Sequence, residues 1–258
     1  MLQSEFKNML IRSIPAADFD LLRPHFEPIQ LKLRNTTIQA GRSISHVYFP
    51  EKGQFSVIVK VPTSEPIEIG LFGVDGMTEM SPDFRASFTT VVQLDLEAHK
   101  IDAKLFADAV KASPGLTDLT VRYHQAMLAQ LAYTAFSHGS LSVSERLARW
   151  LLMAHDRAEG DELPLAHDFF SWMLAVRRSG VTNALSELRS EGAIATKRAR
   201  VIILNRDKLI ERASGSYGLA EADYRRFLGM SLPRWDKDAQ SSPLKDRKRP
   251  AKIKSVGM

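Results

Sequence analysis

The chain has 258 residues and a net charge of +5, with 44% hydrophobic and 25% charged side chains, as in an ordinary soluble globular protein. It contains no cysteine, which excludes disulfides, thiolate metal sites and cysteine-ligated iron–sulfur clusters. It also lacks a run of about 18 apolar residues and a signal-like N-terminus, so we expect no membrane span and a cytoplasmic protein.

The positive charge gathers in the C-terminal part. Residues 165–212 carry 9 Lys and Arg against 5 Asp and Glu, and residues 233–258 carry 8 against 3, whereas residues 1–140 carry 13 against 15. This distribution is typical of a chain of which one half meets a polyanion.

The first hundred residues predict short helices followed by strands. Prolines at 15, 24 and 28 break the helical pattern of residues 5–27. Apolar residues then recur with a period of two to about residue 101, and glycines punctuate this stretch at 41, 53, 73 and 76. Short alternating strands between turn residues indicate a β-sandwich or barrel.

A long helix is predicted next, from Pro114 to about Gly139. Its heptad-like seam consists of Leu116, Leu119, Tyr123, Met127, Gln130 and Thr134. A stripe sustained over six turns favours a dimer coiled coil, although the same stripe could pack on the β-domain. A second helix, from about Ser142 to Asp156, precedes a polar connector at residues 158–164.

Residues 167–192 predict a helix, a tight connection and a second helix. In the second helix Val181, Ala184, Leu185 and Leu188 follow the i, i+3, i+4, i+7 spacing of one buried stripe. The opposite face carries Arg178, Ser179, Thr182, Asn183, Ser186 and Arg189. Arg can bind guanine and Asn can bind adenine in the major groove, so this face suits base reading. An ordinary surface helix would also be polar on its outer side.

A basic hairpin follows the second helix. Residues 193–204 alternate between strand-forming residues and the cations Lys197, Arg198 and Arg200, as in a wing that contacts phosphates beside the groove. We expect DNA to be contacted by Arg177, Arg178, Ser179, Thr182, Asn183, Lys197, Arg198 and Arg200. The tail after residue 232 is rich in proline and charge, and we expect it to be disordered, either as a solvated segment or as a nonspecific phosphate contact.

These residues resemble one family over nearly the whole chain, the cyclic-AMP receptor / fumarate-nitrate-reduction (CRP/FNR) regulators. The match is strongest in SERLARWLLMAHDRAEGDELPLAHDFFSWMLAVRRSGVTNALSELRSEGAI and weaker in HVYFPEKGQFSVIV and IEIGLFGVDGM. It is closest to the branch common in α-proteobacteria whose effector is uncharacterised. The resemblance also implies that Arg178, Ser179 and Asn183 occupy the base-reading positions.

The resemblance implies an α+β fold in four parts. A cyclic-nucleotide-binding-like β-roll (jelly roll) would span residues 1–112, a dimerisation helix 113–140, a winged helix-turn-helix 141–212, and a C-terminal extension 213–258. It further implies a homodimer on double-stranded DNA, with RNA polymerase as a partner and an unknown small-molecule effector.

The effector-pocket candidates depart from the nucleotide-binding members of the family. A glycine–glutamate pair holds the ribose there, whereas this chain has Gly76 and Met77, and methionine cannot accept a hydroxyl hydrogen bond as a carboxylate does. The pair that would hold the phosphate, Arg85 and Ser87, is separated by Ala86. We therefore expect no cyclic nucleotide, and no other cofactor or metal.

Two other functions place different demands on the sequence. A cupin-like metal enzyme would need clustered ligands around His46 or His99, and the sequence shows no such cluster and no catalytic motif. The second alternative is a signal-sensing module that binds partners without specific DNA recognition. In such a module, replacement of Arg178 or Asn183 would not change any preference for DNA bases. We predict a transcription regulator rather than an enzyme.

Overall fold

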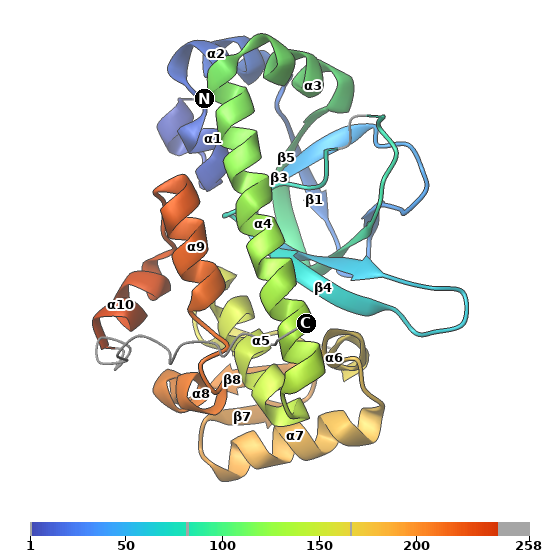
Figure 1. The fold of residues 1–258 in the computed structure, drawn as a ribbon, viewed down its shortest axis with the longest axis vertical. Helices are drawn as coiled ribbons and strands as arrows, with labels where there is room; N and C mark the ends of the chain where they lie inside the picture. Colours follow the sequence, from blue (N-terminus) through green and yellow to red (C-terminus); the bar gives the residue numbers. More distant parts are fainter. Residues whose placement is uncertain (1, 81–82, 166, 242–258) are drawn as a thin grey trace, which may run out of the picture.

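The structure, a computed structural model, describes residues 2–80, 83–165 and 167–241. Its longest helix, α4, runs along the molecule (Figure 1). A β-domain packs along one side of α4, while α9 and α10 lie on the other side. Helices α5 to α8 and a small sheet form the end of the molecule where α4 finishes.

The N-terminal sheet is antiparallel and curls into the predicted β-roll. Its strands pair in the order β1-β5-β3-β4, with β2 also paired to β5. The register between β3 and β5 shifts near Gly53, which has φ +79° and stands so close to the Asp95 carbonyl that a Cβ would clash. Glycine therefore permits the bend there. The strands are β1 (Glu27–Leu31), β2 (Thr36–Ile38), β3 (His46–Val59), β4 (Ile67–Phe72) and β5 (Thr89–Asp102).

Short helices close one end of the β-roll; of the prolines predicted to break them, Pro15 stands at a helix start, whereas Pro24 lies within a short 3-10 helix and Pro28 within the first strand. The helices pack aromatic rings on the sheet, for example Phe106 edge-on against Phe49 with ring centroids 5.6 Å apart. These elements are η1 (Gln3–Glu5), α1 (Met9–Ser13), α2 (Ala16–Leu22), η2 (Arg23–His25) and α3 (Ala103–Ala112).

Helix α4 (Pro114–Ser140) buries its predicted seam against its own β-roll. The Tyr123 hydroxyl donates to the Met77 carbonyl at 2.8 Å and accepts from the Met77 N–H at 3.0 Å. The Gln130 side-chain oxygen accepts from the Leu71 N–H at 2.9 Å. The prediction that this seam pairs two subunits is therefore wrong, because a heptad period marks a buried stripe but not the surface that buries it. The seam residues are Leu116, Leu119, Tyr123, Gln130 and Thr134, which are buried, and Met127, which is partly buried.

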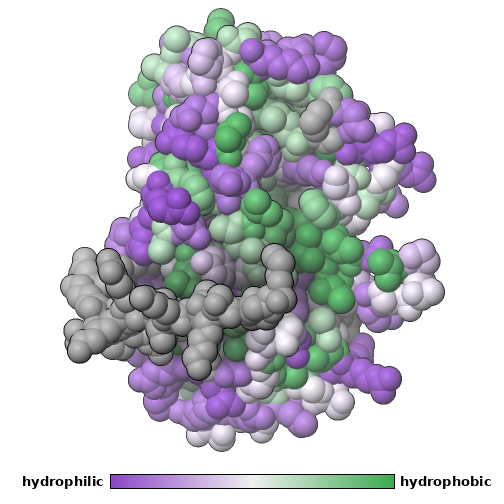
Figure 2. All heavy atoms as spheres, in the orientation of Figure 1, coloured by the Kyte–Doolittle hydropathy of each residue, from purple (hydrophilic) through white to green (hydrophobic). Residues whose placement is uncertain are grey.

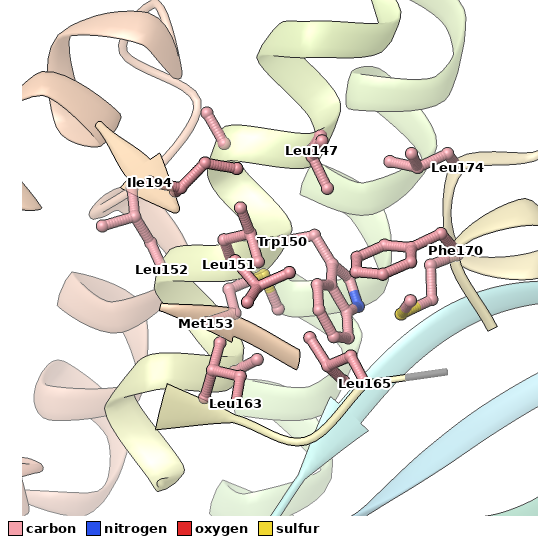
Figure 3. Close-up of a cluster of buried hydrophobic side chains, with 14 of the residues drawn as sticks. Leu147, Trp150, Leu151, Leu152, Met153, Leu163, Leu165, Phe170, Leu174 and Ile194 are labelled. Atoms are coloured by element: carbon pink, nitrogen blue, oxygen red, sulfur yellow. The ribbon is translucent and has the colours of Figure 1, made fainter. Parts of the chain in front are cut away.

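The C-terminal domain is a helix-turn-helix with a β-hairpin. Trp150 and Leu151 of α5 pack on Phe170 and Leu174 of α6 and on Ile194 of β7 (Figure 3). Strands β6, β8 and β7 pair in that order. The elements are α5 (Val143–Arg157), β6 (Glu162–Leu163), α6 (His167–Leu174), α7 (Arg178–Ser190), β7 (Ile194–Lys197), β8 (Arg200–Ile203) and α8 (Arg206–Arg212).

The core of this domain is continuous with one face of the β-roll. Helix α6 packs on β4, and Ile58, Leu71, Val91 and Leu94 of the roll belong to the same apolar cluster. The polar residues that alternate with them are consequently buried too, and Glu68 accepts hydrogen bonds from the roll and from Trp150 of α5.

The C-terminal extension is helical over α9 (Leu219–Leu228) and α10 (Pro233–Ser241). Trp235 is only 3% exposed. The expectation of disorder after residue 232 is therefore wrong up to Ser241. Although the segment is rich in charge, the ring of Trp235 is buried in an apolar cluster that other parts of the chain supply. Residues 242–258, on which the rest of that expectation falls, lie outside the described residues. Within the described residues, no helix is long and apolar enough to cross a membrane.

Candidate nucleic-acid interface

Helices α6 and α7 meet at a sharp turn that directs α7 outward. Ala175 adopts φ +51°, which reverses the chain after α6. Arg146 of α5 donates to the Leu174 carbonyl at 2.9 Å and so satisfies a free acceptor at the end of α6. The predicted stripe of α7 anchors it, since Val181, Ala184, Leu185 and Leu188 are all buried.

The opposite side of α7 faces solvent at the end of the molecule (Figure 1). The Thr182 hydroxyl donates back to the Arg178 carbonyl at 3.1 Å, so its oxygen keeps acceptor capacity only. The first turn carries no acidic side chain, which leaves the positive end of the helix dipole uncompensated there. The exposed residues of this reading face are Arg177, Arg178, Ser179, Thr182 and Asn183.

The hairpin β7–β8 places the predicted phosphate contacts beside α7. Lys197 and Arg200 are cross-strand partners, and Arg198 and Ala199 form the turn between them, with Ala199 at φ +55°. All three cations are exposed. Arg200 donates to Glu162 of β6 at 2.7 Å, an exposed pair that DNA phosphates would compete with.

Sequence reasoning missed two contacts that brace this surface. Lys208 of α8 donates to the Glu191 carbonyl at 2.7 Å, beyond the last turn of α7. Arg189 of α7 donates to Thr196 of the wing at 3.4 Å and joins the two reading elements. Arg189 lies in the last turn of α7 and belongs to the polar face that the sequence predicted, whereas Lys208 lies in the next helix, so no local pattern indicates its contact.

The effector-pocket candidates do not form one site. Met77 is buried, with its backbone bonded to Tyr123 of α4, and a Cβ on Gly76 would press on the same hydroxyl. Arg85 is exposed and donates to the Gly41 carbonyl at 3.2 Å.

The backbone near Ser87 already holds a carboxylate. Glu79 accepts from the Ser87 N–H at 2.9 Å and from the Phe88 N–H at 3.2 Å. Sequence reasoning missed Glu79, which the chain folds back onto these amides. Among the described residues, no group of His, Asp and Glu is arranged to hold a metal ion, around His46 and His99 or elsewhere.

Residues 145–212 match the family described as the Crp-like helix-turn-helix domain. They form a Crp-like DNA-binding domain. The match begins in α5 and ends in α8, so it contains the reading face, the wing and the braces described above. No curated protein matches the chain in sequence.

The fold of the chain is similar to that of solved regulators, among them members of the CRP/FNR family. FixK2 from Bradyrhizobium japonicum aligns with a TM-score of 0.64 at 13% identity, over 72% of this chain and 96% of its own. A CRP-family regulator from Thermus thermophilus aligns with a TM-score of 0.60 at 18% identity, over 79% and 98%. The c-di-GMP-responsive regulator CLP from Xanthomonas campestris aligns with a TM-score of 0.58 at 16% identity, over 73% and 99%.

The family match thus confirms the predicted CRP-type helix-turn-helix, and the structural similarity confirms the predicted fold class. In this chain a cyclic-nucleotide-binding-like β-roll precedes a Crp-like winged helix-turn-helix domain.

Proposed function

We propose that this protein acts as a homodimer that reads a near-palindromic operator in double-stranded DNA. The observation that carries the proposal is the two-sided construction of α7. Its apolar stripe is buried in the Crp-like domain, while Arg178 and Asn183 are exposed on the opposite side.

Each exposed group has a distinct role on DNA. Arg178 and Asn183 offer donors that suit guanine and adenine edges, and Ser179 can donate or accept beside them. Lys197, Arg198 and Arg200 on the wing would neutralise phosphates and set the register of the helix on the duplex.

The second subunit would pair along the outer face of α4. Three large apolar side chains are exposed there, Val121 at 56%, Leu128 at 57% and Phe136 at 54%. Ala132 and Ala135 lie between Leu128 and Phe136 and are also exposed, which allows close approach of two helices. Figure 2 shows hydrophobic spheres on this face, over the middle of α4 and beside β4. A two-fold axis along this face would bring the same surface of both subunits together.

We propose further that DNA reading does not need a cyclic nucleotide. The Met77 side chain is buried. The backbone N–H groups of Ser87 and Phe88, which a bound phosphate would need as donors, already donate to the Glu79 carboxylate. The contact with RNA polymerase stays a prediction, as does any other effector.

Selection of bound DNA from a random pool tests this function. The full chain should enrich a sequence with two related half-sites about 34–36 Å apart, equally with and without added cyclic nucleotides. Asn183→Ala and Arg178→Ala should each relax preference at one base position and cost about 1–3 kcal/mol on the best site. The matched control is Arg226→Ala, which removes an exposed arginine of α9. Failure to enrich any sequence, or loss of binding without loss of base preference, would refute the proposal.

A further inference from the structure

The segment after the Crp-like domain lies against both parts of the subunit. Helix α9 packs beside α4 on the side away from the β-roll (Figure 1). Tyr224 of α9 donates to the Asp75 carbonyl of the β-roll at 2.5 Å, and Arg122 of α4 donates to the Phe227 carbonyl at 3.4 Å. Helix α9 is therefore attached to the N-terminal domain and to α4.

Helix α10 contacts the C-terminal end of α5, the first helix of the DNA-binding domain. Trp235 donates its indole N–H to the buried carboxylate of Asp156 at 2.8 Å. Arg234 donates to the carbonyls of His155 at 2.5 Å and Ala158 at 2.8 Å, and to that of Gly160 at 2.9 Å. These carbonyls lie at or just beyond the C-terminus of α5, where helices leave acceptors unsatisfied.

The two helices of the extension meet over an ion pair that joins the domains. Arg157 at the end of α5 forms a two-pronged pair with Asp75, and both side chains are almost fully buried. The ring of Trp235 lies 5.9 Å from the Arg157 guanidinium and packs edge-on against Tyr224, with ring centroids 5.2 Å apart. The extension thus shields the ion pair from water. A charge-assisted hydrogen bond is strongest in such a water-excluded environment.

Part of the chain lies outside the match to the solved structures described above. Those proteins are matched over 96–99% of their own length by 72–79% of this chain. A fifth or more of the chain consequently has no counterpart in them.

We propose that residues 219–241 are a positioning element that holds the recognition helix α7 at one angle to α4. This inference rests on the proposed function. The extension is bonded to Asp75 and Arg122 on one side and to the end of α5 on the other, so α5 cannot swing without breaking its contacts. In a dimer built on α4, the angle of each α5 sets the distance between the two copies of α7. The extension therefore determines the half-site spacing that the protein accepts.

The test measures spacing tolerance rather than affinity alone. The operator obtained by selection is lengthened or shortened at its centre by one or two base pairs, and each form is titrated with wild type and variants of the full chain. Trp235→Ala removes the ring over Arg157, and Arg234→Gln removes the charged fork that holds the three carbonyls. Trp235→Phe keeps a ring but loses the donor to Asp156, and Arg226→Ala is the control.

Wild type and Arg226→Ala should discriminate steeply against altered spacing. In Trp235→Ala and Arg234→Gln we expect the ratio of affinities between native and altered spacing to fall by about three-fold or more, with base preference unchanged. Trp235→Phe should retain most of the discrimination. Partial unfolding lowers binding to every operator alike and leaves this ratio unchanged, so the ratio separates positioning from stability.

The proposal is overturned if Arg234→Gln and Trp235→Ala bind with the wild-type spacing ratio. If Trp235→Ala does not fold, Arg234→Gln decides the question. A wild type that selects no operator refutes the proposed function instead, so the two failures are distinguishable.

Discussion

Asp75 and Arg157 form a buried, two-pronged ion pair between the β-roll and the DNA-binding domain. Arg157 Nε lies 2.9 Å from Asp75 Oδ1 and Nη2 lies 2.5 Å from Oδ2, and the two side chains are 2% and 3% exposed. Arg157 also donates to the Met153 carbonyl at 2.7 Å. The pair therefore aligns α5 with the loop after β4.

Removal of one partner of this pair should destabilise the whole subunit. Arg157→Met leaves Asp75 buried without its cation, and Asp75→Asn leaves the guanidinium without its anion, so each should lower the free energy of unfolding by about 3–5 kcal/mol. Urea denaturation followed by tryptophan fluorescence measures this. The double variant should lose less than the sum of the singles. Additive losses would mean that the two groups do not interact.

A buried carboxyl at the same junction should make stability depend on pH. Glu68 accepts hydrogen bonds from Trp150 at 2.6 Å and from Ser56 at 2.5 Å. Burial raises its pKa to about 7, although these bonds and the charge of Arg149 act in the lowering direction. His138, which lies 3.3 Å from the Glu68 carbonyl, also faces this region, and burial lowers its pKa.

The sign of this dependence follows from the proton taken up on folding. An unfolded glutamate ionises near pH 4.5 and folded Glu68 near 7, so the free energy of unfolding falls as pH rises between these values. Glu68→Gln should flatten this slope and be more stable than wild type at pH 8 by roughly 1–3 kcal/mol. Burial also raises the pKa of Asp156 to about 7, so the Glu68→Gln variant should retain the part of the pH dependence that comes from Asp156. Urea titrations from pH 5 to 8 measure both slopes; equal slopes would contradict the assignment.

The outer face of α4 should control assembly without supporting the fold. Leu128→Glu places a charge on an exposed position, so we expect a folded monomer by sedimentation velocity and a large loss of operator affinity. Leu119→Ala, on the inner face, should instead destabilise the subunit by about 2–5 kcal/mol without a specific effect on assembly. A Leu128→Glu variant that stays dimeric would place the subunit interface elsewhere.

The wing should contribute affinity without base preference. Arg198→Ala should weaken all sequences alike and reduce the slope of log affinity against log salt by about one phosphate. Glu162→Gln should have the opposite effect, because it releases Arg200 and removes a negative charge beside the DNA. We expect an increase of roughly two- to five-fold at low salt. Fluorescence anisotropy over a salt series measures both; a base-specific change in either variant would contradict a phosphate role.

The sequence by itself determined the elements whose periodicity is local. The stripe of Val181, Ala184, Leu185 and Leu188 settled which side of α7 is buried, and hence that Arg178 faces outward. A helix in this position has only one apolar side, so its orientation follows from its own residues.

Only the tertiary structure decided what covers each buried face. The α4 seam is apolar whether it meets a partner or the β-roll, and the hydrogen bond between Gln130 and Leu71 shows that it meets the roll. Trp235 stands in a segment too charged to form a core of its own, and it becomes ordered because Asp156 and Tyr224, distant in sequence, form a site for it. Burial depends on the surface that another part of the chain supplies, and a local pattern carries no information about that surface.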